Sequence, residues 1–178
     1  AETALSLGAE VKLISGPTDQ ITSSNKINLV KIKTGAQMQK AIINDYNESD
    51  IVIMAAAVSD YKPTEFSKKK IKKDNKEINI KLEKTTDILM ELGKTKKNQI
   101  LVGFALENND ELSNAKHKLK KKNLDLIVLN SLNDEGAGFG YDTNKVTVIG
   151  RSGEETAYQL KEKTDVANDI FKHIIKLI

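Results

Sequence analysis

The strongest constraint on the fold is a nearly continuous apolar run at residues 51–57, Ile-Val-Ile-Met-Ala-Ala-Ala. Such a run is typical of a central strand in a parallel sheet, because helices cover both faces of that strand. Runs of the same character occur at 100–105 and 124–129. A helical pattern over 36–46 precedes the first run, at 51–57, and another over 109–123 separates the last two. Strands that alternate with helices predict right-handed βαβ units. We therefore expect an α/β fold with a Rossmann-like open, mostly parallel sheet and helices on both faces.

Shorter patterns complete the predicted order of elements. Two β-rich runs come before residue 36, and a strictly alternating run later in the chain predicts a strand exposed on one side. Thr86 and Thr164 are candidate caps for two further helices, the second at the C-terminus. An antiparallel strand pair is expected just before that last helix. The predicted strands outside the core runs are 11–15, 29–33, 78–83, 145–149 and 156–160.

The N-terminal residues look like the end of a helix. Gly8 follows a short helical pattern at the position where a left-handed backbone often ends a helix. Because a domain rarely begins inside a helix, we expect that a preceding strand, and the loop that joins it to this helix, are missing from residues 1–178.

Composition excludes several classes of function. The chain has no Cys, so a disulfide scaffold, a thiolate nucleophile and a Cys-ligated zinc site are ruled out. No apolar run approaches the ~20 residues of a membrane span, and the start lacks a secretory signal pattern. We expect a cytoplasmic protein that does not associate with membranes. The net charge of +3 suits phosphorylated ligands without requiring nucleic acid.

The candidate site lies where the core strands end, because open α/β sheets bind ligands beyond the carboxyl ends of their strands. After the run at 51–57, small residues let a ligand ring approach the backbone, and Asp60 can accept hydrogen bonds from a base or a sugar. Asp60 as a turn former at a tightly packed strand end is an equally good interpretation. Phe104 could flank a base, although a core Phe is commoner. Glu107 could hold a metal, a substrate amine, or nothing.

A basic run, Lys68–Lys73, follows the strand that we expect to bind the base. Composition alone favours a solvated charged face. The position of the run and the single Ile inside it raise another interpretation, in which a Lys lies over a triphosphate and offsets the charge that builds during displacement at phosphorus.

Taken together, these segments resemble the phosphopantothenate–cysteine ligase family, also called phosphopantothenoylcysteine synthetases. In many bacteria this ligase is the second half of a bifunctional coenzyme A enzyme. The stretches that carry the resemblance are Gly8–Val11, Ser15–Thr18, Ala55–Tyr61, Lys70–Lys73, Lys84–Leu89, Val102–Asn108, Lys121–Ile127 with Asn130, Gly138–Phe139 and Asp142–Asn144. Each is weak alone, but together they span nearly the whole chain.

The resemblance implies a ligase activity that could not be derived from the residues alone. The family activates the carboxylate of phosphopantothenate with CTP and Mg²⁺, and the amine of cysteine then displaces CMP. Lys70 matches the catalytic lysine. The implied nucleotide contacts are Ala56, Ala57, Asp60, Phe104 and Lys84, and weaker phosphate or substrate contacts are Gly16, Lys73 and Asn130. No protein metal ligand is implied. A homodimer and a preceding flavin-dependent decarboxylase domain are also implied, while a preference for CTP over ATP depends on backbone geometry.

The match has one gap, and two rival functions remain. The family's N-terminal strand, its Gly-Gly-Thr loop and a segment that supplies a catalytic Asn have no counterpart in these 178 residues. An NAD(P)-binding oxidoreductase would need G-x-G-x-x-G after a strand, but Gly136–Gly140 does not open a helix. A nucleic-acid-binding module could use Lys68–Lys73 and Lys116–Lys122, but no aromatic residues interleave with them.

Overall fold

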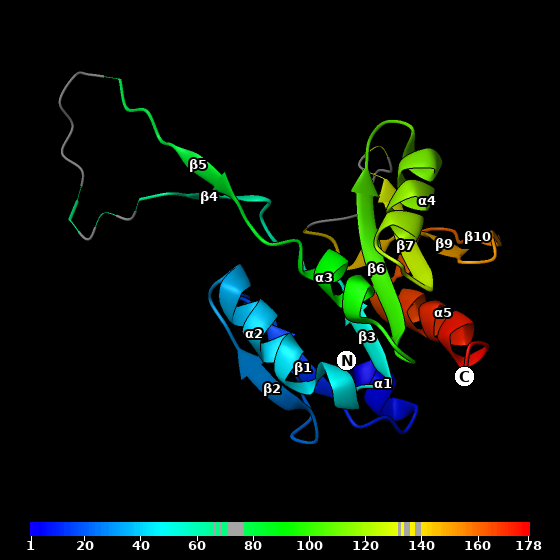
Figure 1. Cartoon of the computed structure of the whole chain (residues 1–178). Coiled ribbons are helices and arrows are strands. Elements are labelled where there is room, and N and C mark those ends of the chain that lie inside the picture. Colours follow the sequence, from blue (N-terminus) through cyan, green and yellow to red (C-terminus); the bar gives the residue numbers. More distant parts are fainter. Residues whose placement is uncertain (66, 68, 71–76, 132, 134–135, 138–139) are drawn as a thin grey trace.

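The computed structural model describes the chain except for residues 66, 68, 71–76, 132, 134–135 and 138–139. Within the described residues, the central sheet has five strands in the order β10-β9-β7-β6-β3 (Figure 1). β3, β6 and β7 are parallel, whereas β9 is antiparallel to both β7 and β10. The bounds are β3 (Ile51–Met54), β6 (Ile100–Glu107), β7 (Leu126–Ser131), β9 (Thr147–Gly150) and β10 (Glu155–Ala157). The predicted α/β class, with a mostly parallel sheet and an antiparallel pair near the C-terminus, is confirmed.

The central strand β6 shows why its sequence is apolar throughout. Leu101 and Ala105 point into one buried cluster and Val102 into another, so both faces of the strand are covered. The first cluster is completed by α2 (Gly35–Asp45), α3 (Ile88–Thr95) and α4 (Glu111–Lys121), and the second by α5 (Lys163–Ile175). Helices on both faces are therefore confirmed, and the covered sheet leaves its strand ends as the place where polar groups can gather.

Two predicted helix caps are wrong. Thr86 does not cap α3: the N-cap is Asp87, whose carboxylate accepts a hydrogen bond from the amide of Met90 at 3.0 Å. Thr164 lies inside α5, whose N-cap residue Glu162 makes no side-chain cap. The start of α2 is held by a capping box in which the side chains of Thr34 and Gln37 each bond the other residue's backbone.

A second, two-stranded parallel sheet joins β1 (Lys12–Ser15) to β2 (Asn28–Lys31). The short helix α1 (Glu2–Ser6) precedes it, and Gly8 has a φ of +89°, which confirms the predicted left-handed end of this helix. The remaining short elements are η1 (Tyr46–Glu48), β8 (Thr143–Asn144) and β11 (Lys161–Glu162), the last two forming an antiparallel pair.

A hairpin arm extends from the body of the molecule (Figure 1). Its described strands are β4 (Tyr61–Pro63) and β5 (Leu82–Lys84), which pair antiparallel. The strand predicted at 78–83 therefore begins later than expected. Among the described helices, none is long and apolar enough to cross a membrane.

Candidate functional site

The parallel strands place the predicted residues at one edge of the sheet. Met54 pairs with Gly103, so Ala55 lies level with Phe104, one residue beyond the end of β3. Ala55, Ala56 and Ala57 are exposed there. A backbone without large side chains at a strand end can be approached closely by a flat ring, as the sequence predicts.

Phe104 and Asn130 lie on the same face of the sheet. Residues of a strand alternate between faces, and Phe104 packs against the cluster that contains Val102 and Val128. Asn130 follows Val128 by two residues and pairs in register with Leu106. Both side chains are half-buried, so they can be reached from the carboxyl edge without disrupting the core.

The structure also brings Asp60 and Lys84 together, at the base of the arm. Tyr61 pairs with Lys84, and the amide of Thr85 donates to the carbonyl of Asp60 at 2.9 Å. Both charged residues are exposed. Within the described part of the chain, neither charged group forms a hydrogen bond or an ion pair, which leaves both available to a ligand.

The loop between β3 and the arm is anchored from its other side. Val58 packs against the first core cluster, and a Cβ built on Gly35 would lie 3.0 Å from its side chain. The start of α2 therefore rests on this loop. This contact fixes the backbone at Ala57 and Asp60 to the core, although their side chains are exposed.

A negative charge is also fixed near the foot of the arm. Asp87 follows Lys84 by three residues and pairs with Lys122 at 2.8 Å. Burial acts to raise the pKa of Asp87, but hydrogen bonds from Lys122 and from the Met90 amide outweigh it and leave the pKa lowered. The carboxylate of Asp87 is engaged in capping α3, so we do not assign it to a ligand.

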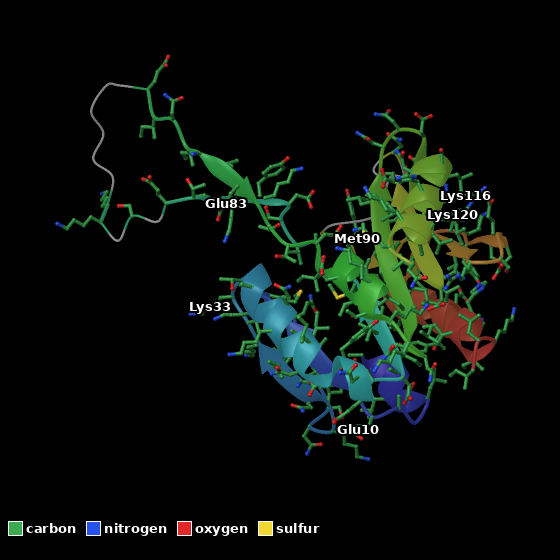
Figure 2. The ribbon with its side chains drawn as sticks, viewed as in Figure 1. Glu10, Lys33, Glu83, Met90, Lys116 and Lys120 are labelled. Atoms are coloured by element: carbon green, nitrogen blue, oxygen red, sulfur yellow. The ribbon has the colours of Figure 1, made fainter. Side chains whose placement is uncertain are left out.

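Lys70 is not brought to this edge. It is exposed and follows β4 in the chain, and no described hydrogen bond or ion pair joins its ammonium group to the sheet edge. Figure 2 shows Glu83 of the same arm standing apart from the helices. Lys73 lies outside the described residues. Gly16 is half-buried and directly follows β1, and β1 does not pair with β3 in the described residues.

Sequence reasoning missed a polar network at the ends of β6 and β7. The carboxylate of Glu107 pairs with Lys118 at 2.5 Å, and Glu111 accepts hydrogen bonds from Ser131 and Asn133. Lys118 belongs to α4, whose side chains tilt toward the helix start and so return to the strand end. The sequence signal for this pair was that Glu107 follows a predicted strand and Lys118 lies in the helix predicted directly after it. This pairing also answers the open question about Glu107, because its carboxylate is paired with the ammonium group of Lys118.

The basic residues of α4 fit a solvated face. Figure 2 shows Lys116 and Lys120 on the outer side of this helix, and Lys116 pairs with Glu155 at 2.6 Å. Among the described residues, no group of three or more His, Asp or Glu could hold a metal ion.

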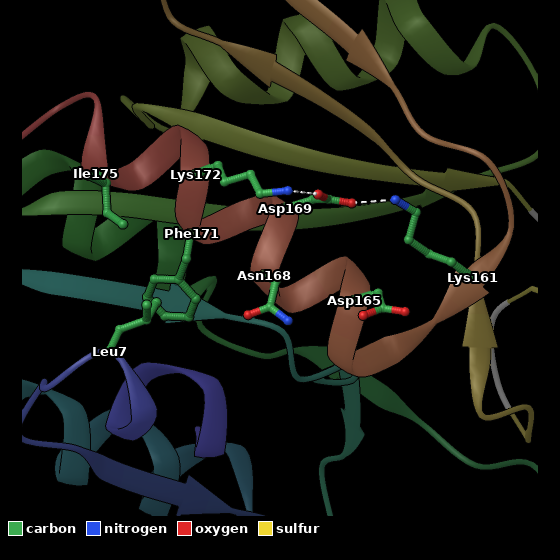
Figure 3. A pocket seen from close by; sticks show the side chains of 8 residues that line it. All are labelled: Leu7, Lys161, Asp165, Asn168, Asp169, Phe171, Lys172 and Ile175. Carbon is green, nitrogen blue, oxygen red and sulfur yellow. Dashed lines mark hydrogen bonds and ion pairs between the residues drawn. The ribbon is translucent and has the colours of Figure 1, made fainter.

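Another cavity lies elsewhere, between α5 and Leu7 at the end of α1 (Figure 3). It has a volume of about 550 Å³ and contains none of the predicted site residues. Its buried carboxylate, Asp169, is paired with Lys161 at 2.5 Å and with Lys172 at 2.8 Å, and these hydrogen bonds lower its pKa. Because both Lys ammonium groups already pair with the Asp169 carboxylate, this carboxylate, which lies beside Phe171 and Ile175, is not available to bind a ligand. We therefore place the site at the sheet edge.

Comparison with known proteins adds a family. A family model described as the DNA/pantothenate metabolism flavoprotein C-terminal domain matches residues 1–178. A coenzyme A biosynthesis bifunctional protein CoaBC from Bacillus subtilis is 43% identical over 99% of the chain and 44% of its own length. A protein named cysteine/cysteine sulfinic acid decarboxylase, from an unknown prokaryotic organism, is 50% identical over 100% of the chain and 50% of its own length. The chain thus spans about half the length of these relatives.

Solved structures give the same result. The C-terminal domain of a coenzyme A biosynthesis bifunctional protein CoaBC superposes with a TM-score of 0.80 at 37% identity, covering 98% of this chain and 77% of that one. A Cab2 mutant in complex with phosphopantothenate-cysteine has a TM-score of 0.67 at 18% identity, covering 85% of this chain and 54% of that one. The second likeness shows the fold alone.

Proposed function

We propose a carboxylate-activating ligase function for this chain, which belongs to the family of DNA/pantothenate metabolism flavoprotein C-terminal domains. In this proposal residues 1–178 form a single nucleotide-binding domain of a coenzyme A biosynthesis enzyme. The substrates are CTP, phosphopantothenate and cysteine. The single observation that carries the proposal is the sheet edge where exposed Ala55–Ala57 lies level with Phe104 and next to the unpaired charges of Asp60 and Lys84.

The reaction needs no nucleophile from the protein. A carboxylate oxygen of phosphopantothenate attacks the α-phosphorus of CTP, and pyrophosphate leaves with the electrons of the broken P–O bond. The amine of cysteine then attacks the acyl carbon, loses a proton, and CMP leaves. Cytosine would lie against the backbone of Ala56 and Ala57, with Phe104 as a wall and Asp60 at the ribose. Lys84 is the proposed phosphate contact, and Gly16, Asn130 and Lys73 are weaker ones.

Lys70 would act only after the arm folds back. Lys70 follows Pro63 by seven residue steps, and an extended chain spans ~3.3–3.6 Å per residue, so Lys70 can lie up to about 24 Å from Pro63. A Lys carried over the triphosphate would stabilise the negative charge that develops at the α-phosphorus. We therefore propose that arm closure, rather than a preformed site, completes the catalytic arrangement.

Magnesium fits the proposal as a companion of the nucleotide. Mg²⁺ retains several waters and is commonly held by substrate phosphates with few protein carboxylates. The described residues offer exposed carboxylate at Asp60 but no cluster that could form a protein cage. The ion would add charge neutralisation at the transferred phosphorus.

The rest of the protein is also a matter for proposal. The length of the relatives is compatible with fusion to a flavin-dependent decarboxylase domain. A homodimer is supported by the apolar row Ile78, Ile80 and Leu82 on the arm, whose side chains are 54–66% exposed. A second copy would remove this row from water.

The test is the release of CMP from CTP by the intact protein. CMP should form at a sustained rate only when phosphopantothenate and cysteine are both present, and ATP in place of CTP measures the nucleotide preference. Lys70→Gln should abolish amide formation without changing the far-UV circular dichroism. The neighbouring Lys69→Gln is the matched control and should keep most of the activity. Full turnover in Lys70→Gln would remove the catalytic assignment, and tight NADH binding without any response to CTP would favour the oxidoreductase alternative.

A further inference from the structure

A short segment connects β10 to α5 and lies against that helix. We call residues Tyr158–Glu162 the connector. The hydroxyl of Tyr158 lies 2.9 Å from Nε2 of His173 on α5, and Lys161 pairs with Asp169 of the same helix at 2.5 Å. The ring of Tyr158 also packs against the core cluster that α5 completes. Two polar contacts and one apolar contact therefore hold the connector on the helix.

The connector in turn holds residues that follow β7 in the chain. Its last two residues form β11, which pairs antiparallel with β8. The amide of Tyr158 donates to the carbonyl of Val146 at 2.9 Å, and the amide of Lys163, directly after the connector, donates to the carbonyl of Asp142 at 2.9 Å. A loss of contact between the connector and α5 would therefore also loosen β8 and Asp142.

His173 lies in a buried place that already holds positive charge. It is 9% exposed, and its ring meets the Tyr158 ring edge-on, with the two centroids 6.0 Å apart. The ammonium nitrogen of Lys161 lies 4.8 Å from the centre of the Tyr158 ring. Asp169 lies one turn before His173, but Figure 3 shows its carboxylate between Lys161 and Lys172, and it pairs with both. A proton on His173 would therefore add a further cation to this place, while the carboxylate of Asp169 is already paired.

The surroundings of His173 favour a neutral imidazole. Burial lowers the pKa of His173, and the charge of Lys176 lowers it further. Glu154 and Asp169 act in the opposite direction without cancelling these two effects. The titratable and charged groups around the ring belong to the connector, to the residue before β10, and to α5 with its C-cap: Tyr158, Lys161, Glu154, Asp169, Lys172 and Lys176.

We propose that the Tyr158–His173 contact is a pH-sensitive switch that holds the connector on α5 while His173 is neutral and releases it in acid. When the connector opens, water reaches the imidazole, which can then take up a proton. Because the pKa of His173 is lower in the closed form, this form has its full stability above the ordinary pKa of 6.5 and loses stability as pH falls from 6.5 toward the lowered pKa. Uptake of one proton raises the ratio of open to closed molecules by up to about tenfold for each pH unit in that range.

Amide hydrogen exchange of the intact protein, read by mass spectrometry from about pH 7.5 to about pH 5, tests the switch. The measured quantity is the protection factor, which is the exchange rate expected for an unfolded chain divided by the observed rate, so that the direct effect of pH on exchange cancels. Peptides that contain Tyr158 and Lys163 should lose protection by up to about tenfold for each pH unit below 6.5.

Two variants separate His173 from other titrating groups. His173→Gln keeps a polar side chain that does not titrate, so protection of the same peptides should no longer depend on pH in this range. The matched control is His117→Gln, because His117 is the only other His of the chain and is exposed on α4. This control should keep the pH dependence of the unaltered protein.

Tyr158→Phe tests the contact itself, since it keeps the ring and removes only the hydroxyl. Protection of the same peptides should fall about 2- to 12-fold at about pH 7.5, which corresponds to the loss of one hydrogen bond. Exchange of the His173 Cε1 hydrogen, read in the same digests, gives the midpoint of its titration, which should lie below 6.5.

Four results would overturn the proposal. They are protection that stays constant over the pH range, protection that falls equally in His173→Gln, protection that is unchanged in Tyr158→Phe, and a His173 midpoint at or above 6.5. The measurements contain no nucleotide, so their outcome is independent of the proposed ligase function.

Discussion

The ion pair between Lys96 and Asp125 gives the sharpest prediction about stability. The Lys96 side chain is only 7% exposed and that of Asp125 is 19% exposed. Asp125 also accepts a hydrogen bond from the amide of Leu101 at 2.7 Å, and Lys96 donates to the carbonyl of Asn123 at 3.4 Å. This pair therefore ties the start of β6 to the residues that precede β7.

Asp125→Asn should keep the bond to Leu101 but leave the ammonium of Lys96 buried without its counter-charge. Removing one partner of a buried pair costs ~3–5 kcal/mol, and the partial exposure of Asp125 points to the lower end, about 3 kcal/mol. That cost should lower Tm by roughly 6–12 °C in a chain of this size. Urea unfolding followed by far-UV circular dichroism measures it, with an unchanged m-value as the sign that only stability has changed.

The matched control is the exposed pair Lys94–Glu91, whose side chains are 61% and 45% exposed. Glu91→Gln should cost no more than about 0.5 kcal/mol, because water screens that pair. The double variant Lys96→Met with Asp125→Asn should recover more than half of the loss, since no charge stays buried. The reasoning fails if Asp125→Asn costs as little as Glu91→Gln, or if the double variant is as unstable as the sum of its parts.

Three further outcomes are expected. Gly93→Ala should destabilise the fold by about 1–3 kcal/mol in urea unfolding, because the new Cβ would lie 1.9 Å from the carbonyl oxygen of Lys122. This clash should outweigh the helix preference of Ala over Gly, which is ~1 kcal/mol. A gain in stability would contradict the packing described. The pairs with Lys161 and Lys172 lower the pKa of Asp169, so its contribution to folding stability is fully present above the ordinary pKa of 3.8 and is lost as pH falls through the lowered pKa. Asp169→Asn should therefore flatten the dependence of Tm on pH in that range. An unchanged slope would show that these two pairs contribute nothing to stability. Phe104→Leu should cost less than about 1.5 kcal/mol of stability but weaken CTP binding about 5- to 100-fold by calorimetry, and an unaltered Kd would remove Phe104 from the base site.

The core of the fold could be predicted from sequence because its signals are local. The run at 100–105 is apolar since Leu101 and Val102 face different buried clusters, and no other arrangement accommodates such a strand easily. The cap of α3 could not be predicted in this way. Thr86 and Asp87 are both capping residues, and the choice of Asp87 is reinforced by its pair with Lys122, 35 residues away.

The strand predicted at 78–83 was misplaced for a similar reason. Its alternation is real, but a strand needs a partner, and β4 ends at Pro63 opposite Leu82. Proline has no backbone N–H to donate to the ladder, and the last described backbone bond of this pair joins the Thr64 amide to the Lys81 carbonyl at 3.0 Å. Sequence periodicity shows that a segment can form a strand, but the neighbouring strand determines how many of its residues pair.

The same limit applies to the site. The place of Ala56, Ala57 and Phe104 near the ends of β3 and β6 could be expected from sequence, because strand register brings Ala55 level with Phe104, whereas their role as nucleotide contacts stays a prediction. Lys70 could not, since its location depends on how the arm is held. The arm is fixed at its base, where Tyr61 pairs with Lys84 and Thr85 bonds Asp60. In the proposed closure, Asp60 and Lys84 therefore stay in place, because these contacts hold them at the base of the arm.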